Sequence, residues 1–165
     1  MATLAVTITE SVTLNGAARG STNSLSITGV DDIYHRIVTC IANVDTTVAN
    51  FNTQVDVEDS GIDTQDTKYI RVTNLDSTHP VNLSLQIDIS ESGSGAADPN
   101  ENLTILLGAG ESFIMGTPHD SIAVGESGAS GASIQSAALH DLESILVDPG
   151  ANAVQVEVFV ASVVP

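Results

Sequence analysis

The sequence predicts an all-β protein, an antiparallel β-sandwich of the jelly-roll type with about 8–10 strands and at most one short helix. Three observations predict it. Apolar and polar residues alternate with a period of two, turn residues recur at short intervals, and the amphipathic helices that a parallel α/β sheet needs between its strands are missing. The 165 residues suit one domain, which we expect to span residues 1–165.

The expected strands follow in chain order. In residues 4–14 the large apolar residues stand at even positions only, which predicts a strand at an edge of the sheet. Asn15 and Gly16 follow and predict a tight turn. Residues 37–44 are apolar on both phases, as in a central strand covered on two sides. Residues 69–73, 81–89 and 154–160 each alternate, and the second of these alternates without a break, so we expect three half-buried strands there.

The remaining segments are loops and one ambiguous element. Residues 90–102 and 125–131 are rich in Gly, Ser and acidic residues, and we expect exposed loops. Residues 133–146 place Ile134, Ala138, Leu142 and Ile145 near one helical face, which predicts the single short helix. The alternative, a strand over residues 142–147, stays open.

The charge of the chain limits its partners. There are 21 acidic and 4 basic residues, a formal net charge of −17, which disfavours nucleic acid and anionic membrane surfaces as partners. The single cysteine excludes an intramolecular disulfide, and its apolar surroundings predict that Cys40 is a small buried residue. The N-terminus has no basic region and no apolar run reaches the ~18 residues of a membrane span, so we expect assembly in a cytoplasm.

The best candidate for a metal site is an acidic stretch, although we favour a solvated loop over a bound cation there. Its carboxylates supply the oxygen atoms that Ca²⁺ prefers, but the twelfth position of a calcium loop is Thr67 instead of Glu. The four histidines have no metal-ligand spacing, and no cofactor is expected. The candidate metal ligands are Asp56, Glu58, Asp59, Asp63 and Asp66.

No catalytic motif is present in the sequence. A G-x-S-x-G element is missing, and residues 108–112 lack the third glycine and the strand-to-helix context of a phosphate-binding loop. Aromatic residues make up 3% of the chain, too few to line a sugar cleft. We therefore expect that the protein is not an enzyme.

Four segments together carry a family resemblance. Residues 68–78 run into the alternating strand 80–85, residues 108–115 follow, and residues 156–162 close the chain. This order resembles small β-sandwich virion proteins of tailed bacteriophages, notably capsid decoration (cement) proteins. The resemblance implies a non-enzymatic protein that oligomerises, often as a homotrimer, and binds the major capsid protein on the outer surface of the virion. It supplies no catalytic residues.

Two sets of residues are candidates for partner contacts. Leu4, Val6 and Ile8 lie on the N-terminal strand, which either is exchanged with a neighbouring subunit or is an ordinary edge strand of its own sheet. Lys68 and Arg71 are close together in a very acidic chain, which favours contact with a negatively charged partner.

Two other functions remain open. One is another virion component, such as a head fibre, a neck or tail adaptor or a receptor-binding module. The other is a calcium-dependent β-sandwich adhesion module that uses the acidic loop.

Overall fold

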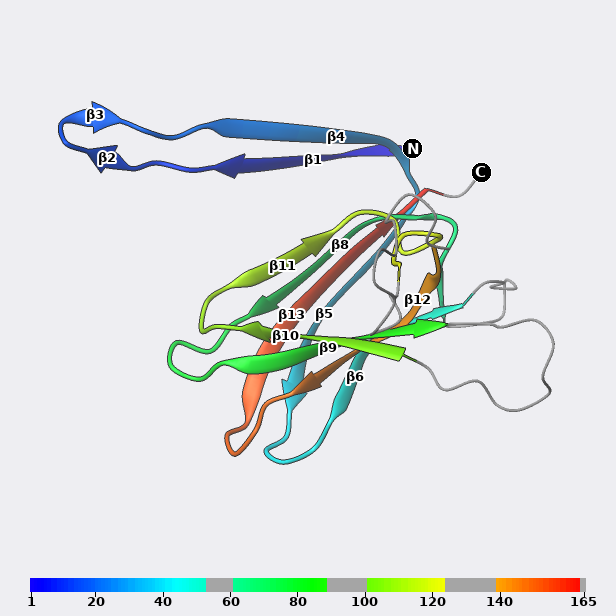
Figure 1. Ribbon diagram of the computed structural model, residues 1–165. Helices are drawn as coiled ribbons and strands as arrows, with labels where there is room; N and C mark the ends of the chain where they lie inside the picture. The colour runs from blue at the N-terminus through cyan, green and yellow to red at the C-terminus, as the bar shows by residue number, and fades with distance from the viewer. Residues whose placement is uncertain (53–60, 89–100, 124–138, 164–165) are drawn as a thin grey trace, which may run out of the picture.

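The computed structural model describes residues 1–52, 61–88, 101–123 and 139–163, and these residues form strands and loops only (Figure 1). The prediction of an all-β fold is confirmed. Because the described residues contain no helix, none of them belongs to a membrane-spanning helix. The strands are β1 Ala2–Thr9, β2 Thr13–Leu14, β3 Ala17–Ala18, β4 Thr22–Val30, β5 Asp32–Cys40, β6 Thr46–Asn52, β7 Ile62–Asp63, β8 Thr67–Asn74, β9 Val81–Asp88, β10 Glu101–Leu107, β11 Ser112–Met115, β12 Asp141–Asp148 and β13 Val154–Ser162.

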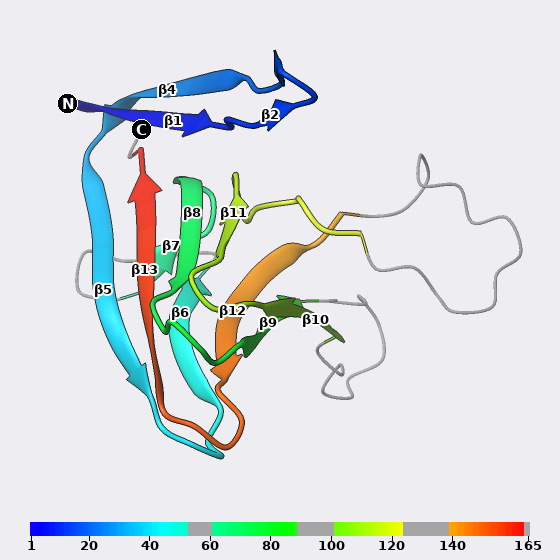
Figure 2. The same ribbon diagram turned by 90° about the vertical axis from the view of Figure 1, so that its left-hand side faces the viewer.

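Two sheets pack face to face to form the body (Figure 2). One has the order β10-β9-β12-β6-β7 and the other the order β11-β8-β13-β5. Every pairing between the described strands is antiparallel except β6 with β7, which is parallel. The architecture is that of a β-sandwich, and ten of the thirteen described strands have four or more residues, because β2, β3 and β7 have two each.

The core lies between the two sheets and follows from the alternation in the sequence. In β9 the odd residues Val81, Leu83, Leu85 and Ile87 are buried, as the sequence predicts for residues 81–89. They meet the inward side chains of the other sheet, such as those of Val156 and Val158 in β13. Burial of these apolar side chains on both inner faces is the main stabilising term of the fold.

The prediction of a helix over residues 133–146 is wrong in its C-terminal part. Residues 133–138 lie outside the described residues, but Asp141–Asp148 is strand β12, which agrees with the alternative of a strand over 142–147. A register shift between Leu142 and Ser144 marks a β-bulge. Because the extra residue changes the phase of the strand, Leu142 and Ile145 are both buried although they are three positions apart. The bulge therefore produces a spacing that imitates a helical face.

The prediction that residues 37–44 form a central strand, covered on both faces, is also wrong. Within the described part of the chain, β5 pairs with β13 alone and forms an edge of its sheet. Its inward residues Tyr34, Val38 and Cys40 pack on the core, whereas Ile37 is 61% exposed on the outer face. The apolar residues at alternate positions of β5 therefore have two different environments. One set packs on the core, and the other set is exposed on the outer face of the sheet, where the described part of the chain does not cover it.

The predicted loops are only partly within the described residues. Residues 90–100 and 125–131 lie outside them. Glu101 and Asn102, which we expected in the first loop, begin strand β10 and pair with Ile87 and Gln86 of β9. Strand β10 therefore begins two residues before the end of the predicted loop, although these two residues are polar.

The N-terminal segment forms a hairpin arm, residues 1–30, that stands apart from both main sheets (Figure 1). Strand β1 pairs with β4, and β2 pairs with β3 across the predicted turn. Asn15 and Gly16 have φ values of 51° and 78°, the left-handed region that such a turn requires. The segment is therefore an edge strand of a separate two-stranded ribbon and not of a main sheet, while exchange between subunits stays a prediction.

Cys40 gives a direct test of the sandwich. Its side chain is 0% exposed, and burial raises the pKa of the thiol although a hydrogen bond to Thr46 opposes the shift. Because alkylation requires an accessible thiolate, we expect no reaction with iodoacetamide in the native protein and complete reaction in denaturant, measured by mass spectrometry. Rapid modification of the native protein would show that this region of the core is open.

Candidate functional site

The hairpin arm is amphipathic because of its register. Leu4 lies opposite Ile27 and Val6 lies opposite Leu25, and residues directly opposite in an antiparallel pair share a face. The other face carries hydroxyl groups, with Thr7 hydrogen-bonded to Ser24 and Thr9 to Thr22, both at 3.3 Å. The arm therefore has an apolar underside and a polar upper side.

The underside faces the outer surface of the β11-β8-β13-β5 sheet (Figure 2). Leu4, Val6 and Ile27 are partly buried there against Tyr69 and Ala161. A cleft of about 400 Å³ remains between β1 and the sheet, lined mainly by apolar side chains, with Thr7, Arg71 and Ser112 as its polar members. The structure thus brings the predicted contact residues Leu4, Val6 and Ile8 together along one wall of this cleft.

The predicted pair of cations is not brought together. Lys68 and Arg71 are three positions apart in β8, so alternation directs them to opposite faces of the sheet. The Lys68 ammonium donates to the carbonyl oxygen of Gln65 at 2.6 Å. The Arg71 guanidinium bonds the Glu157 carboxylate, which also bonds His35 at 2.8 Å. The charge of Arg71 is therefore balanced within the chain, which weakens the prediction that it contacts a negative partner.

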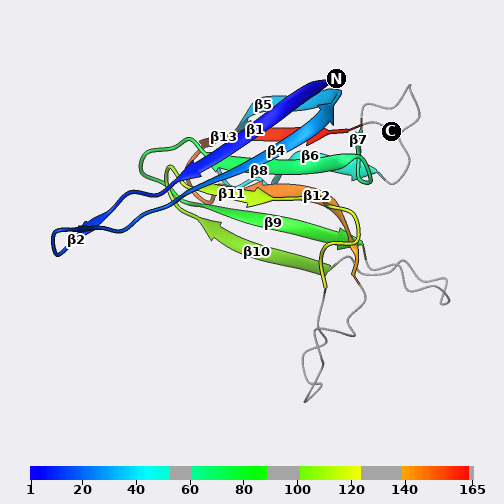
Figure 3. The same ribbon diagram turned by 90° about the horizontal axis from the view of Figure 1, so that it is seen from above.

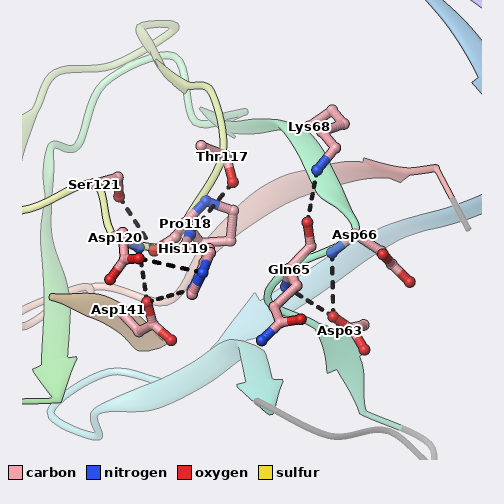
Figure 4. Close-up of polar contacts among 10 residues, drawn as sticks. All are labelled: Asp63, Gln65, Asp66, Lys68, Thr117, Pro118, His119, Asp120, Ser121 and Asp141. Atoms are coloured by element: carbon pink, nitrogen blue, oxygen red, sulfur yellow. Dashed lines mark hydrogen bonds and ion pairs between the residues drawn. The ribbon is translucent and has the colours of Figure 1, made fainter. Parts of the chain in front are cut away.

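The acidic loop is only partly described. Asp56, Glu58 and Asp59 lie outside the described residues. The Asp63 carboxylate accepts hydrogen bonds from the backbone amides of Gln65 at 2.7 Å and Asp66 at 3.1 Å (Figure 4). Asp63 therefore shapes the turn that precedes β8, a role typical of aspartate in an Asx turn.

A second cluster of ionisable groups is formed by His119, Asp120 and Asp141 (Figure 4). The segment after β11 folds back on β12, where the amide of Leu142 donates to the carbonyl oxygen of Pro118 at 3.0 Å. This places Nδ1 of His119 2.9 Å from Oδ1 of Asp141, and Nε2 3.3 Å from Oδ2 of Asp120. The same Asp141 oxygen accepts the backbone amide of Asp120 at 2.7 Å.

This cluster offers one imidazole and two carboxylates within 4.8 Å of one another, ligands that suit a divalent ion such as Zn²⁺. It is not arranged as a catalytic triad, because the Ser121 hydroxyl donates to the Pro118 carbonyl at 3.1 Å and Nε2 of His119 faces Asp120. The sequence alone does not predict this cluster, since His119 and Asp141 are 22 positions apart and no motif spacing connects them.

Asp141 should contribute to stability through this cluster. We expect Asp141→Ala to lower the free energy of unfolding by about 2 kcal/mol, since a half-buried carboxylate that accepts two hydrogen bonds is lost. Urea denaturation measures the change. Asp120→Asn is the matched control, because Asp120 is exposed and makes one contact of 3.3 Å, and asparagine tolerates its φ of 44°; the change should have little effect. Equal losses would contradict the assigned role of Asp141.

Comparisons with known proteins add no relative. No protein-family model, curated protein or solved structure matches this chain. The features of the molecule that bear on function are therefore the arm, the surface beneath it and the distribution of charge.

Proposed function

We propose that the protein is a non-enzymatic structural component of a virus particle, a capsid decoration (cement) protein that binds and stabilises the assembled phage head. Its partners are the major capsid protein and further copies of itself, with a homotrimer favoured. The observation that supports the proposal most is the hairpin arm, which projects from the β-sandwich (Figure 1). Extended strands and ribbons of this kind serve recognition by docking on neighbouring surfaces.

The charge of the arm differs from that of the body. Residues 1–30 carry one acidic and one basic residue, Glu10 and Arg19, so the whole formal net charge of −17 lies on the remaining chain. Free copies therefore repel one another through their bodies, which favours solubility. The arm, with no net charge and an apolar underside, is suited to contacts with a subunit or lattice.

Stabilisation of the head then follows from mass action. A protein that binds the assembled lattice and not the separated capsid subunits lowers the free energy of the assembled state. Such binding requires no catalytic group. We propose that it occurs on the outer surface of the capsid, after assembly in the host cytoplasm.

The test is addition of the purified chain to heads that lack it. We expect binding to saturate at a copy number comparable to that of the major capsid protein, and the temperature of head disruption to rise. Quantitative gel densitometry and a thermal dye-release assay measure the two quantities. Saturation at only tens of copies would instead indicate a tail, neck or adaptor component, and no binding would overturn the proposal.

A further inference from the structure

We infer that the outer half of the hairpin arm docks on the outer face of β5 in a second copy of this chain, so that copies join head to tail. This deepens the proposed function and rests on it, since it assumes that the arm serves assembly. The two surfaces are defined by their exposed apolar side chains. The arm patch consists of Val12, Leu14 and Leu25 together with Ile8, which also lines the cleft above its own sheet. The β5 patch consists of Ile33 and Ile37 on β5 and of Ile41 and Val44 in the turn that follows it.

The first support is the large share of the exposed apolar side chains that the arm and the β5 segment carry. Among the described residues, fourteen large hydrophobic side chains are exposed, and eight of them belong to these two patches. Their exposed fractions lie between 45% and 63%. Several exposed apolar side chains along one element are typical of an interaction surface, whereas single exposed apolar residues need no explanation.

The second support is that neither patch is covered by other described residues of its own chain. A two-stranded ribbon is marginally stable in water, and only the base of the arm is packed on the body. Strand β5 pairs, among the described strands, with β13 alone and leaves its other edge open. Apolar side chains on the outer face of an edge strand stay exposed unless a neighbouring surface covers them. Contact between the two patches buries the apolar side chains of both.

The third support is the placement of the patches at opposite edges of one sheet. The arm joins β5 through Asp31 and crosses above β13 and β8 toward β11, beyond which its tip projects (Figures 2 and 3). A second copy beside the β11 edge would therefore present its β5 patch to the arm patch of the first. Such a contact joins two different surfaces, so it is heterologous and closes into a ring when the rotation permits.

The fourth support is electrostatic. Two bodies that each carry the full −17 repel one another at close range, whereas an arm with no net charge spans the gap between them. Association through the arm should therefore strengthen as salt screens the repulsion between bodies.

The test is the mass in solution by light scattering at 0.15 M salt. We expect the natural chain to have a multiple of 17.0 kDa, and Leu25→Asp and Ile37→Asp each to be monomeric. Ser24→Asp on the polar side of the arm and Leu106→Asp on β10 are the controls; each adds the same charge and should stay assembled. A monomeric natural chain, or assembly in both patch variants, would overturn the inference.

A mixture of the two monomeric variants identifies the surfaces. Leu25→Asp retains an intact β5 patch and Ile37→Asp retains an intact arm patch, so their mixture should form dimers. If arms instead contact arms, Ile37→Asp alone would stay assembled, and the inference would be wrong. Head binding by a monomeric natural chain would overturn this inference while leaving the proposed function intact.

Discussion

Leu83→Ala is expected to lower the free energy of unfolding by about 3 kcal/mol, the usual range being about 2–5 kcal/mol for a leucine in a core. The Leu83 side chain is 0% exposed and lies in β9 between the two sheets. Its removal leaves a cavity, because the β9 backbone is held by β10 on one side and β12 on the other and does not collapse inward. Urea denaturation monitored by circular dichroism measures the change.

The matched control is Leu106→Ala in the neighbouring strand β10. Leu106 is 67% exposed, so the same truncation removes little buried surface and should change the free energy of unfolding by less than about 0.5 kcal/mol. Similar losses for the two variants would contradict the assignment of inner and outer faces in this sheet.

Asn74→Ala is expected to cost about 3 kcal/mol as well, but for a different reason. Asn74 at the end of β8 is 0% exposed, and its amide nitrogen donates to the carbonyl oxygens of His79 at 2.9 Å and Gly108 at 3.1 Å. Its amide oxygen accepts the backbone amide of Asp76 at 3.0 Å. Alanine removes all three hydrogen bonds. The Gly108 carbonyl still accepts the Glu111 amide at 3.1 Å, but the partly buried His79 carbonyl and Asp76 amide lose this partner, at about 1–3 kcal/mol for each unsatisfied group.

The control for this prediction is Asn82→Ala. Asn82 is exposed in β9 and makes one side-chain hydrogen bond of 3.3 Å, to Asp148. We expect its loss to change the free energy of unfolding by about 0.5 kcal/mol or less. If Asn74→Ala were as mild as this control, water would have to replace the lost partners, and the turn between β8 and β9 would be open to solvent.

The turn beside Asn74 also predicts that the free energy of unfolding depends on pH in the acidic range. Backbone amides of His79 and Thr78 donate to the Asp76 carboxylate at 2.7 Å and lower the pKa of that group. A depressed pKa in the folded state means that the stabilisation is present above the ordinary pKa and is lost as the pH falls through the folded value. The stabilising contribution of Asp76 should therefore be complete above the ordinary pKa of an aspartate and decline as the pH falls below it.

The parts of the fold that were predicted from the sequence are those governed by local chemistry. Unbroken alternation defined β9 and β13, and Asn15 with Gly16 defined the tip of the arm. The predictions were wrong where contacts between residues far apart in the sequence determine the structure. The bulge in β12 imitates helical spacing, and an apolar outer face made edge strand β5 resemble a central one.

The same distinction applies to the candidate site. Leu4, Val6 and Ile8 share a phase in the sequence, so their common wall in the cleft was predictable. The pairing of Arg71 with Glu157 joins residues 86 positions apart, and no local pattern reveals it. The cluster of His119 and Asp141 depends on a loop that folds back on β12, which the sequence alone does not indicate.

Oxidative cross-linking tests most directly whether the arm of one copy meets β5 of the next. In a variant with both Leu25→Cys and Ile37→Cys, oxidation should produce covalent multimers on a non-reducing gel. Neither single variant should do so, since the native Cys40 is buried. Monomers alone from the double variant, or dimers from Leu25→Cys alone, would contradict the account.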